Sequence, residues 1–325
     1  MICKKTLHGR FVSGRFTPIR MLAFSLILML MAFWFPASAV PVELPEEFSF
    51  LGVVTSRLVS ILLYAASALL ISDQIFFDKR VQWVGALYFC MVAILPFANG
   101  NGILALTSLL LVRSLVALFA CNQYGANYIK LLYTVFMILG FMTFVTPFVL
   151  YLIPLYLVYC LFVNVLSARL FLASLLGLLT PFWIILGTEY VFGGSGVLAD
   201  SVLTGINAAF SLSVGGNSHL SIILLVFALM LMLPAVATFV RSAYPTKPHL
   251  RRRLSFIMVA DAYLLLLYCF VGNGAMLFYF WQLPFLTVLA TYLFSGKQTK
   301  RINLYFIVVN IVMLAIATQS LWLKR

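Results

Sequence analysis

The clearest shortage in this sequence is of charged residues. Only 9% of the 325 residues are charged, whereas 64% are hydrophobic; a soluble globular protein carries about 25% charged residues. This shortage excludes a soluble protein, because so apolar a chain would expose a large hydrophobic surface to water. A membrane protein has no such difficulty, and runs of the roughly 20 apolar residues that a transmembrane helix needs recur along the chain.

Residues for common catalytic and metal chemistry are also scarce. The chain has three histidines and eight acidic residues, and it lacks the HExxH, paired CxxC, GxxxxGK[ST] and GxSxG patterns. Metal, cofactor, nucleotide and triad chemistry are therefore not expected. The five cysteines lie in the basic N-terminus or within apolar runs, which indicates no disulfide framework. In a membrane protein the net charge of +13 indicates orientation rather than a nucleic-acid partner.

Long apolar runs are what the sequence has in abundance. The run from Ser221 to Val240 is apolar at every phase, unlike the alternating strands of a membrane barrel. We therefore predict an all-α, polytopic transmembrane helical bundle that forms a single domain over residues 1–325. The expected spans, about eleven, are residues 21–40, 51–72, 81–98, 102–121, 129–145, 147–164, 170–189, 220–240, 255–272, 275–294 and 302–321.

The first span raises a question of processing. Residues 1–20 are basic, and the apolar run after them ends at Ala37, Ser38 and Ala39, as in a cleavable signal peptide. Cleavage would leave ten helices and would change the side of no later loop. Signal peptides and membrane anchors overlap in length, and we favour an uncleaved first helix.

The basic residues predict the orientation. With residues 1–20 placed in the cytoplasm, all of the 21 Lys and Arg residues lie on the cytoplasmic side except Arg57, Arg113, Lys324 and Arg325. Basic residues in short loops are retained in the cytoplasm. We therefore expect a multi-pass protein of the bacterial inner membrane, in contact with membrane lipids.

Three charged residues fall within expected spans. Arg113 lies about 17 Å along its span, at a cost of at least about 2.5 kcal/mol if buried; we favour a helix that tilts or ends there, with the side chain snorkelling to the headgroups. Asp261 lies about 12 Å from the inner face. It pairs either with Arg113 or with Arg252 or Arg253. Arg57 is shallow enough to snorkel outward.

Two outer segments hold further candidates. Glu43, Glu46 and Glu47 follow the first span and are weak candidates for a general base, although acidic residues are also simply common at an outer surface. Between residues 200 and 211, apolar residues recur at helical spacing after an N-cap at Asp200. We expect a short amphipathic helix at the outer interface there.

The loop punctuation resembles that of an uncharacterised polytopic inner-membrane protein family of Bacteroidota. The likeness covers most of the chain from Ser56 and rests on stretches such as PFANGNG, LLLVRSLVALF, SARLFLASLLGLLTPFWI and RRRLSFIMVADAYLL. Some members are distantly similar to multi-span lipid-dependent glycosyltransferases, which use an acidic residue of the first outer loop as base. Members tend to carry an Arg pair where this chain has only Arg113, and the resemblance implies a helix end at that point. It transfers no catalytic residue.

Three functions remain open from the sequence. The first is an integral inner-membrane protein with no assigned reaction, for example a component of envelope assembly with protein partners. The second is an enzyme that transfers a sugar from a polyprenyl-phosphate donor at the outer face, with Glu43, Glu46 or Glu47 as base and Arg57 near the donor phosphate. The third is a transporter of a lipid or small solute, with Arg113 and Asp261 in a path lined by helices that proline kinks.

Overall fold

The structure is a computed structural model of the whole chain. It describes residues 49–72, 83–93, 95, 98, 101–120, 128–162, 167–191, 204, 207, 219–241, 248–271, 275–295, 304–305, 308–313 and 315–316. The expected first span, the short outer helix apart from Thr204 and Asn207, and half of the residues of the last expected span lie outside these residues.

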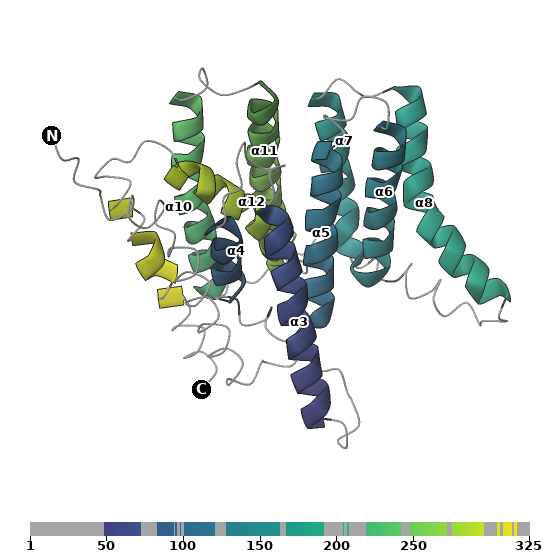
Figure 1. Cartoon of the computed structure of the whole chain (residues 1–325), viewed down its shortest axis with the longest axis horizontal. Helices are drawn as coiled ribbons and strands as arrows, with labels where there is room; N and C mark the ends of the chain where they lie inside the picture. Colours follow the sequence, from purple (N-terminus) through teal and green to yellow (C-terminus); the bar gives the residue numbers. More distant parts are fainter. Residues whose placement is uncertain are drawn as a thin grey trace. The chain divides into compact units, whose positions relative to one another are not determined.

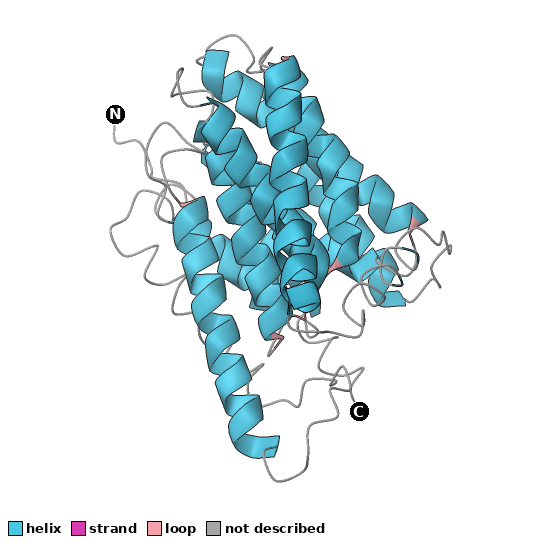
Figure 2. Cartoon of the chain, turned by 90° about the vertical axis from the view of Figure 1, so that its right-hand side faces the viewer, coloured by secondary structure: helices cyan, strands magenta, loops and turns pink. Residues whose placement is uncertain are grey.

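Within the described residues the fold is helical, with no strand (Figures 1 and 2). This confirms the predicted all-α class. The helices, in chain order, are α3 (Ser49–Ile71), α4 (Trp83–Ala93), α5 (Gly102–Ala120), α6 (Tyr128–Val145), the 3-10 helix η2 (Pro147–Tyr151), α7 (Leu152–Phe162), α8 (Ala168–Val191), α10 (His219–Arg241), α11 (Pro248–Phe270) and α12 (Ala275–Ser295).

Six of these helices are long and apolar enough to cross a membrane. They are α5, α6, α8, and the segments Ser221–Val240 of α10, Leu250–Phe270 of α11 and Ala275–Phe294 of α12. Shorter apolar helices occur at Thr55–Ile71, Val84–Ala93 and Pro147–Phe162. This is the pattern of a multi-pass membrane protein. The total of eleven or ten spans stays a prediction, because part of the chain lies outside the described residues.

The chain forms two compact units, whose boundaries cut two helices. Unit 1 contains α3, α4, α10, α5 up to Leu106 and α12 from Leu283. Unit 2 contains α6, η2, α7, α8, α11, α5 from Thr107 and α12 up to Gln282. The single domain expected over residues 1–325 stays a prediction.

Unit 1 is packed through a close helix contact and a polar contact within its core. A Cβ on Gly85 of α4 would lie 2.8 Å from the carbonyl oxygen of Ala68 of α3, so this approach requires glycine. The Thr287 hydroxyl of α12 also donates to the Met91 sulfur of α4, at 3.4 Å. A small residue such as Gly85 lets membrane helices approach each other closely.

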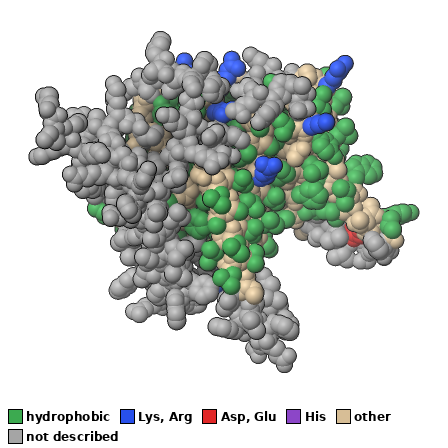
Figure 3. Space-filling view, in the orientation of Figure 1, with side chains coloured by type: hydrophobic (Ala, Val, Ile, Leu, Met, Phe, Trp, Pro, Cys, Tyr) green, Lys and Arg blue, Asp and Glu red, His purple; other side chains and the backbone are tan. Residues whose placement is uncertain are grey.

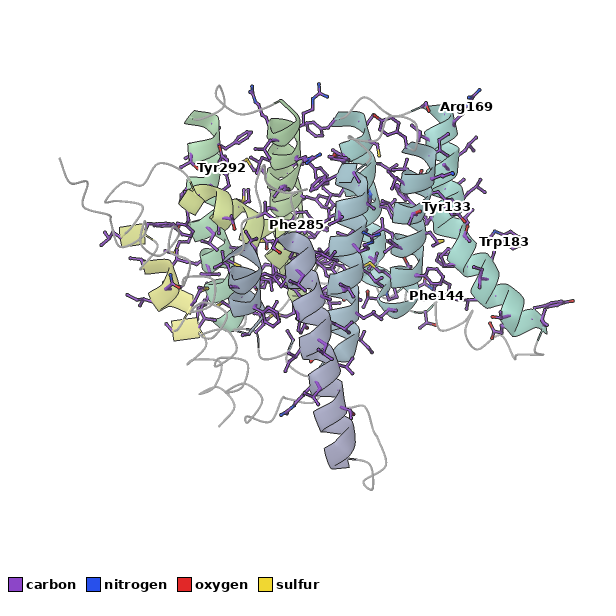
Figure 4. The ribbon with its side chains drawn as sticks, viewed as in Figure 1. Tyr133, Phe144, Arg169, Trp183, Phe285 and Tyr292 are labelled. Atoms are coloured by element: carbon purple, nitrogen blue, oxygen red, sulfur yellow. The ribbon has the colours of Figure 1, made fainter. Side chains whose placement is uncertain are left out.

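In unit 2 the most extensive helix contact joins α6 and α8. A Cβ on Gly140 of α6 would lie 2.6 Å from the Leu178 carbonyl oxygen, and one on Gly177 of α8 would lie 2.5 Å from the Tyr133 carbonyl oxygen. The hydroxyls of Tyr133 and Thr180 are hydrogen-bonded across the same contact, at 2.9 Å. Figure 4 shows Tyr133 between the two helices. The paired glycines therefore bring the two backbones together.

The other face of α8 is exposed and apolar. Only 28% of this helix is buried, and Trp183 points away from α6 with 75% of its surface exposed (Figure 4). The helix changes direction along its length in Figure 1, near the internal Pro181. Arg169 stands at its first turn and Glu189 near its end, and Figure 3 shows blue and red side chains separated by green ones along this part of the molecule. Such a surface suits hydrocarbon between two charged interfaces.

A buried carboxyl group between two membrane helices

The strongest candidate site is centred on Asp261 in α11. This helix begins with Pro248, which fits a first helical turn, and continues as an almost unbroken apolar sequence after its arginines. Within the span Leu250–Phe270, Asp261 lies about 16 Å from one end and about 14 Å from the other. Its exposed fraction is 0%. The carboxyl group is therefore in the middle of the span and out of contact with solvent.

The neighbouring polar groups come from α12, which is 89% buried over its span. The Gln282 side-chain nitrogen donates to the backbone carbonyl oxygen of Asp261 at 3.5 Å, and Gln282 is itself 0% exposed. The Gln282 side chain also faces the Asp261 carboxyl group. The Tyr279 phenol is close enough to Asp261 for an electrostatic interaction between the two side chains. The Tyr279 ring packs in turn against Tyr268 of α11, with ring centroids 5.6 Å apart. All four residues belong to unit 2.

Several polar atoms here have no hydrogen-bond partner within the part of the chain that the structure describes. They are both carboxylate oxygens of Asp261, the side-chain oxygen of Gln282 and the indole nitrogen of Trp281. A buried polar group without a partner loses its hydration and gains no hydrogen bond in return. The free-energy cost of burial is far higher for an isolated ionised carboxylate than for a neutral carboxyl group. The site is consequently unstable as a bare anion, and favours a neutral carboxyl group or a bound cation.

The predicted ion pairs of Asp261 are not formed. The carboxylate oxygens have no partner, so Asp261 pairs neither with Arg113 nor with Arg252 or Arg253. Arg252 is exposed near the start of α11. Arg253 is 3% exposed and donates instead to the carbonyl oxygen of Phe119 in the last turn of α5, at 3.4 Å. Eight residues, a little over two helical turns or about 12 Å, separate Arg253 from Asp261, which is too far for the two side chains to pair.

Arg113 lies apart from this site. Helix α5 continues through Arg113 to Ala120, so the helix end that the family resemblance implied at this residue is wrong. Of the two forms of the favoured interpretation, a tilted helix and an early helix end, only the early end is excluded. The residues from Ser114 to Phe119 are buried, whereas Arg113 itself is exposed. The Ser114 hydroxyl is within 2.5 Å of the Tyr156 hydroxyl of α7. An exposed position about 10 Å before the helix end is compatible with the favoured snorkelling of this side chain, which stays a prediction.

The remaining candidates lie at or beyond the start of the described chain. Arg57 of α3 is partly exposed, and its carbonyl oxygen accepts a hydrogen bond from the Ser60 hydroxyl at 2.8 Å. Glu43, Glu46 and Glu47 lie outside the described residues. The general-base hypothesis therefore stays a prediction. No group of three or more His, Cys, Asp and Glu side chains that could hold a metal ion occurs among the described residues.

Asp261 was a candidate from the sequence, but Gln282, which donates to the backbone oxygen of Asp261, was not. A signal was present, since Gln282 interrupts the apolar run AMLFYFWQLPFL. Asp261 is nine residues before the end of α11 and Gln282 is seven residues after the start of α12. In two consecutive antiparallel helices, these counts place both residues at a similar depth.

Comparison with known proteins identifies no relative. No protein-family model, curated protein or solved structure matches the chain. The resemblance to a family of Bacteroidota stays a prediction for this reason. The function is best inferred from the chemistry of the buried carboxyl group.

Proposed function

We propose that this protein carries a small solute or a lipid across the bacterial inner membrane. The supporting observation is the fully buried, unpartnered Asp261 in the middle of a membrane span. Ionisable residues at this depth are rare because of their cost, and they mark substrate, ion or proton pathways.

A role in holding the fold together explains Asp261 poorly. A carboxyl group that stabilised the helix pair would accept hydrogen bonds, yet neither of its oxygens does so. Apolar side chains of similar size commonly stabilise a membrane or protein interior at least as well as a buried charged group. A residue that costs stability and whose carboxylate oxygens have no hydrogen-bond partner among the described residues is best explained by its use in function.

The proposed orientation places the N-terminus in the cytoplasm. In unit 2, exposed basic side chains stand at the starts of three helices: Lys130 in α6, Arg169 in α8, and Arg251 with Arg252 in α11. The hydrogen bond from Arg253 to Phe119 joins the start of α11 to the end of α5. Helix α6 follows α5 in the chain, so its start belongs to the same end of unit 2. Clustering of basic residues at one end is typical of the cytoplasmic side.

Transport can be tested without knowing the substrate. Purified protein in liposomes would be incubated in a small-molecule extract of the host cells and washed, and the contents identified by mass spectrometry. A trace of fluorescent phospholipid in the same liposomes would report lipid exchange between leaflets. Wild-type protein should accumulate at least one solute, or exchange the lipid, and Asp261→Asn should do neither. Contents and lipid exchange equal to those of empty liposomes would overturn the proposal.

A further inference from the structure

No donor among the described residues is hydrogen-bonded to the Asp261 carboxylate oxygens. The Gln282 side-chain nitrogen donates to the backbone oxygen of Asp261, and the Gln282 side-chain oxygen also has no hydrogen-bond partner among these residues. Two acceptor oxygens attract each other only when a hydrogen atom or a cation lies between them. A proton or a cation bound at the carboxylate would therefore complete the site.

A proton fits the site better than a metal ion. Hard cations require several oxygen ligands, about six to eight for calcium, and membrane transporters usually supply carbonyl oxygens for them where a helix is unwound. Helix α11 is continuous through Asp261, and α12 is continuous through Gln282. Their backbone carbonyl groups at this level are thus largely engaged in helical hydrogen bonds. A proton needs only one carboxylate oxygen and one acceptor.

Among the described residues, no charged group is paired with the Asp261 carboxyl group. Helix α12 contributes the phenol of Tyr279, and α11 itself contributes Tyr268, which packs on that ring. Helices α5, η2 and α7 contact α11 at other positions, where Phe119 contacts Arg253, Tyr151 contacts Tyr263, and Tyr159 contacts Phe256. Neutral phenols do not balance the negative charge of a carboxylate. Protonation of the carboxyl group is therefore the simplest way to remove that charge.

We propose that Asp261 and Gln282 form an exchangeable proton-binding site. The protonated carboxyl group donates its O–H to the side-chain oxygen of Gln282, and release of the proton leaves a carboxylate. Only the O–H bond of the carboxyl group is made or broken, and the proton comes from and returns to water at the membrane faces. If transport occurs as proposed above, on which this part of the inference rests, it is coupled to that proton.

Infrared spectroscopy of the full-length protein in lipid tests the site directly. At neutral pH the wild type should show a protonated-carboxyl C=O band that shifts in heavy water and is lost in Asp261→Asn. The band should also disappear reversibly when the pH is raised. Gln282→Leu should move it to higher wavenumber, because the O–H group loses its acceptor. Glu189→Gln removes a carboxyl group at the end of α8 and should leave the band unchanged.

The outcomes separate this inference from the proposed transport. Absence of any band that Asp261→Asn removes would overturn the proton site, while solute uptake could still establish a transporter. A band that neither exchanges in heavy water nor responds to pH would show a permanently neutral carboxyl group and would overturn the site equally. A titrating band without solute uptake or lipid exchange would leave the proton site standing and remove the transport function. Should Asp261→Asn fail to fold, the band shift in Gln282→Leu decides the question.

Discussion

At the scale of single residues, α11 contains two buried ionisable side chains with different environments. Arg253 donates to the Phe119 carbonyl oxygen, and its guanidinium lies 6.0 Å from the centroid of the Phe119 ring. A cation at this position also interacts favourably with the C-terminal end of the α5 dipole. Asp261, in contrast, makes no hydrogen bond through its carboxylate oxygens. Mutations at the two residues should therefore have different effects on stability.

Replacing Arg253 by alanine should destabilise the protein. The change leaves the terminal carbonyl group of Phe119 without its donor and removes side-chain packing against an aromatic ring. Loss of a buried hydrogen bond from a charged group costs about 1–3 kcal/mol. Thermal unfolding in detergent should show a clearly lower midpoint for Arg253→Ala. The adjacent, exposed Arg252→Ala is the control, and equal midpoints for the two variants would show that Arg253 does not hold the end of α5.

Asp261→Asn should leave the stability unchanged within about 0.5 kcal/mol, or raise it. Asparagine has almost the same shape as aspartate and cannot ionise, so the desolvation cost of a buried charge disappears. Unfolding of Asp261→Asn and Arg253→Ala would be followed in the same detergent. A midpoint for Asp261→Asn that falls as far as that of Arg253→Ala would show that the carboxyl group stabilises the fold by more than the proposed hydrogen bond to Gln282, and would weaken its interpretation as a functional group.

At the scale of helices, glycines in α8 differ in what surrounds them. Gly177 faces the backbone of α6, where an added Cβ would lie 2.5 Å from an oxygen atom, whereas no atom lies within 4 Å of a Cβ on Gly187. Gly177→Ala should therefore destabilise the protein by about 1–3 kcal/mol through overpacking. Gly187→Ala should be neutral or stabilise by up to about 1 kcal/mol, as alanine favours a helix. Thermal unfolding of both variants measures the difference, and a tolerated Gly177→Ala would exclude the close α6–α8 contact.

The sequence predicted a helix end correctly only where the helix and its apolar run end at the same residue. The expected span 102–121 agrees with α5, Gly102–Ala120. Helix α11 begins at Pro248, well before the expected 255, because arginines can remain helical while their charged groups extend to the interface. Helix α4 covers only Trp83–Ala93 of the expected 81–98. Hydropathy marks the width of the apolar medium, and backbone hydrogen bonding decides where a helix ends.

The candidate site, too, could be predicted only in part. Features of single residues are visible in the sequence, whereas contacts between residues far apart in the chain are not. A single charged residue in an apolar run is visible in the sequence, and Asp261 was found for this reason. That its oxygens lack partners, and that Arg253 turns to Phe119 instead, depends on which helices are neighbours. Neighbour relations of this kind arise from packing of side chains far apart in the chain, so composition and spacing alone could not supply them.

At the scale of the whole molecule, the remaining prediction concerns the direction in which helices cross the bilayer. Helix α8 has 24 residues and is about 36 Å long, with Arg169 at its first turn, Glu189 near its last, and a largely exposed apolar surface between them (Figure 4). In a cysteine-free background, Arg169→Cys should react with a membrane-impermeant thiol reagent only in inverted membrane vesicles. Glu189→Cys should react in intact spheroplasts. Labelling of both residues from one side would show that α8 does not span the membrane, and the reverse pattern would place the basic ends of α6, α8 and α11 outside, against the retention of basic loops in the cytoplasm.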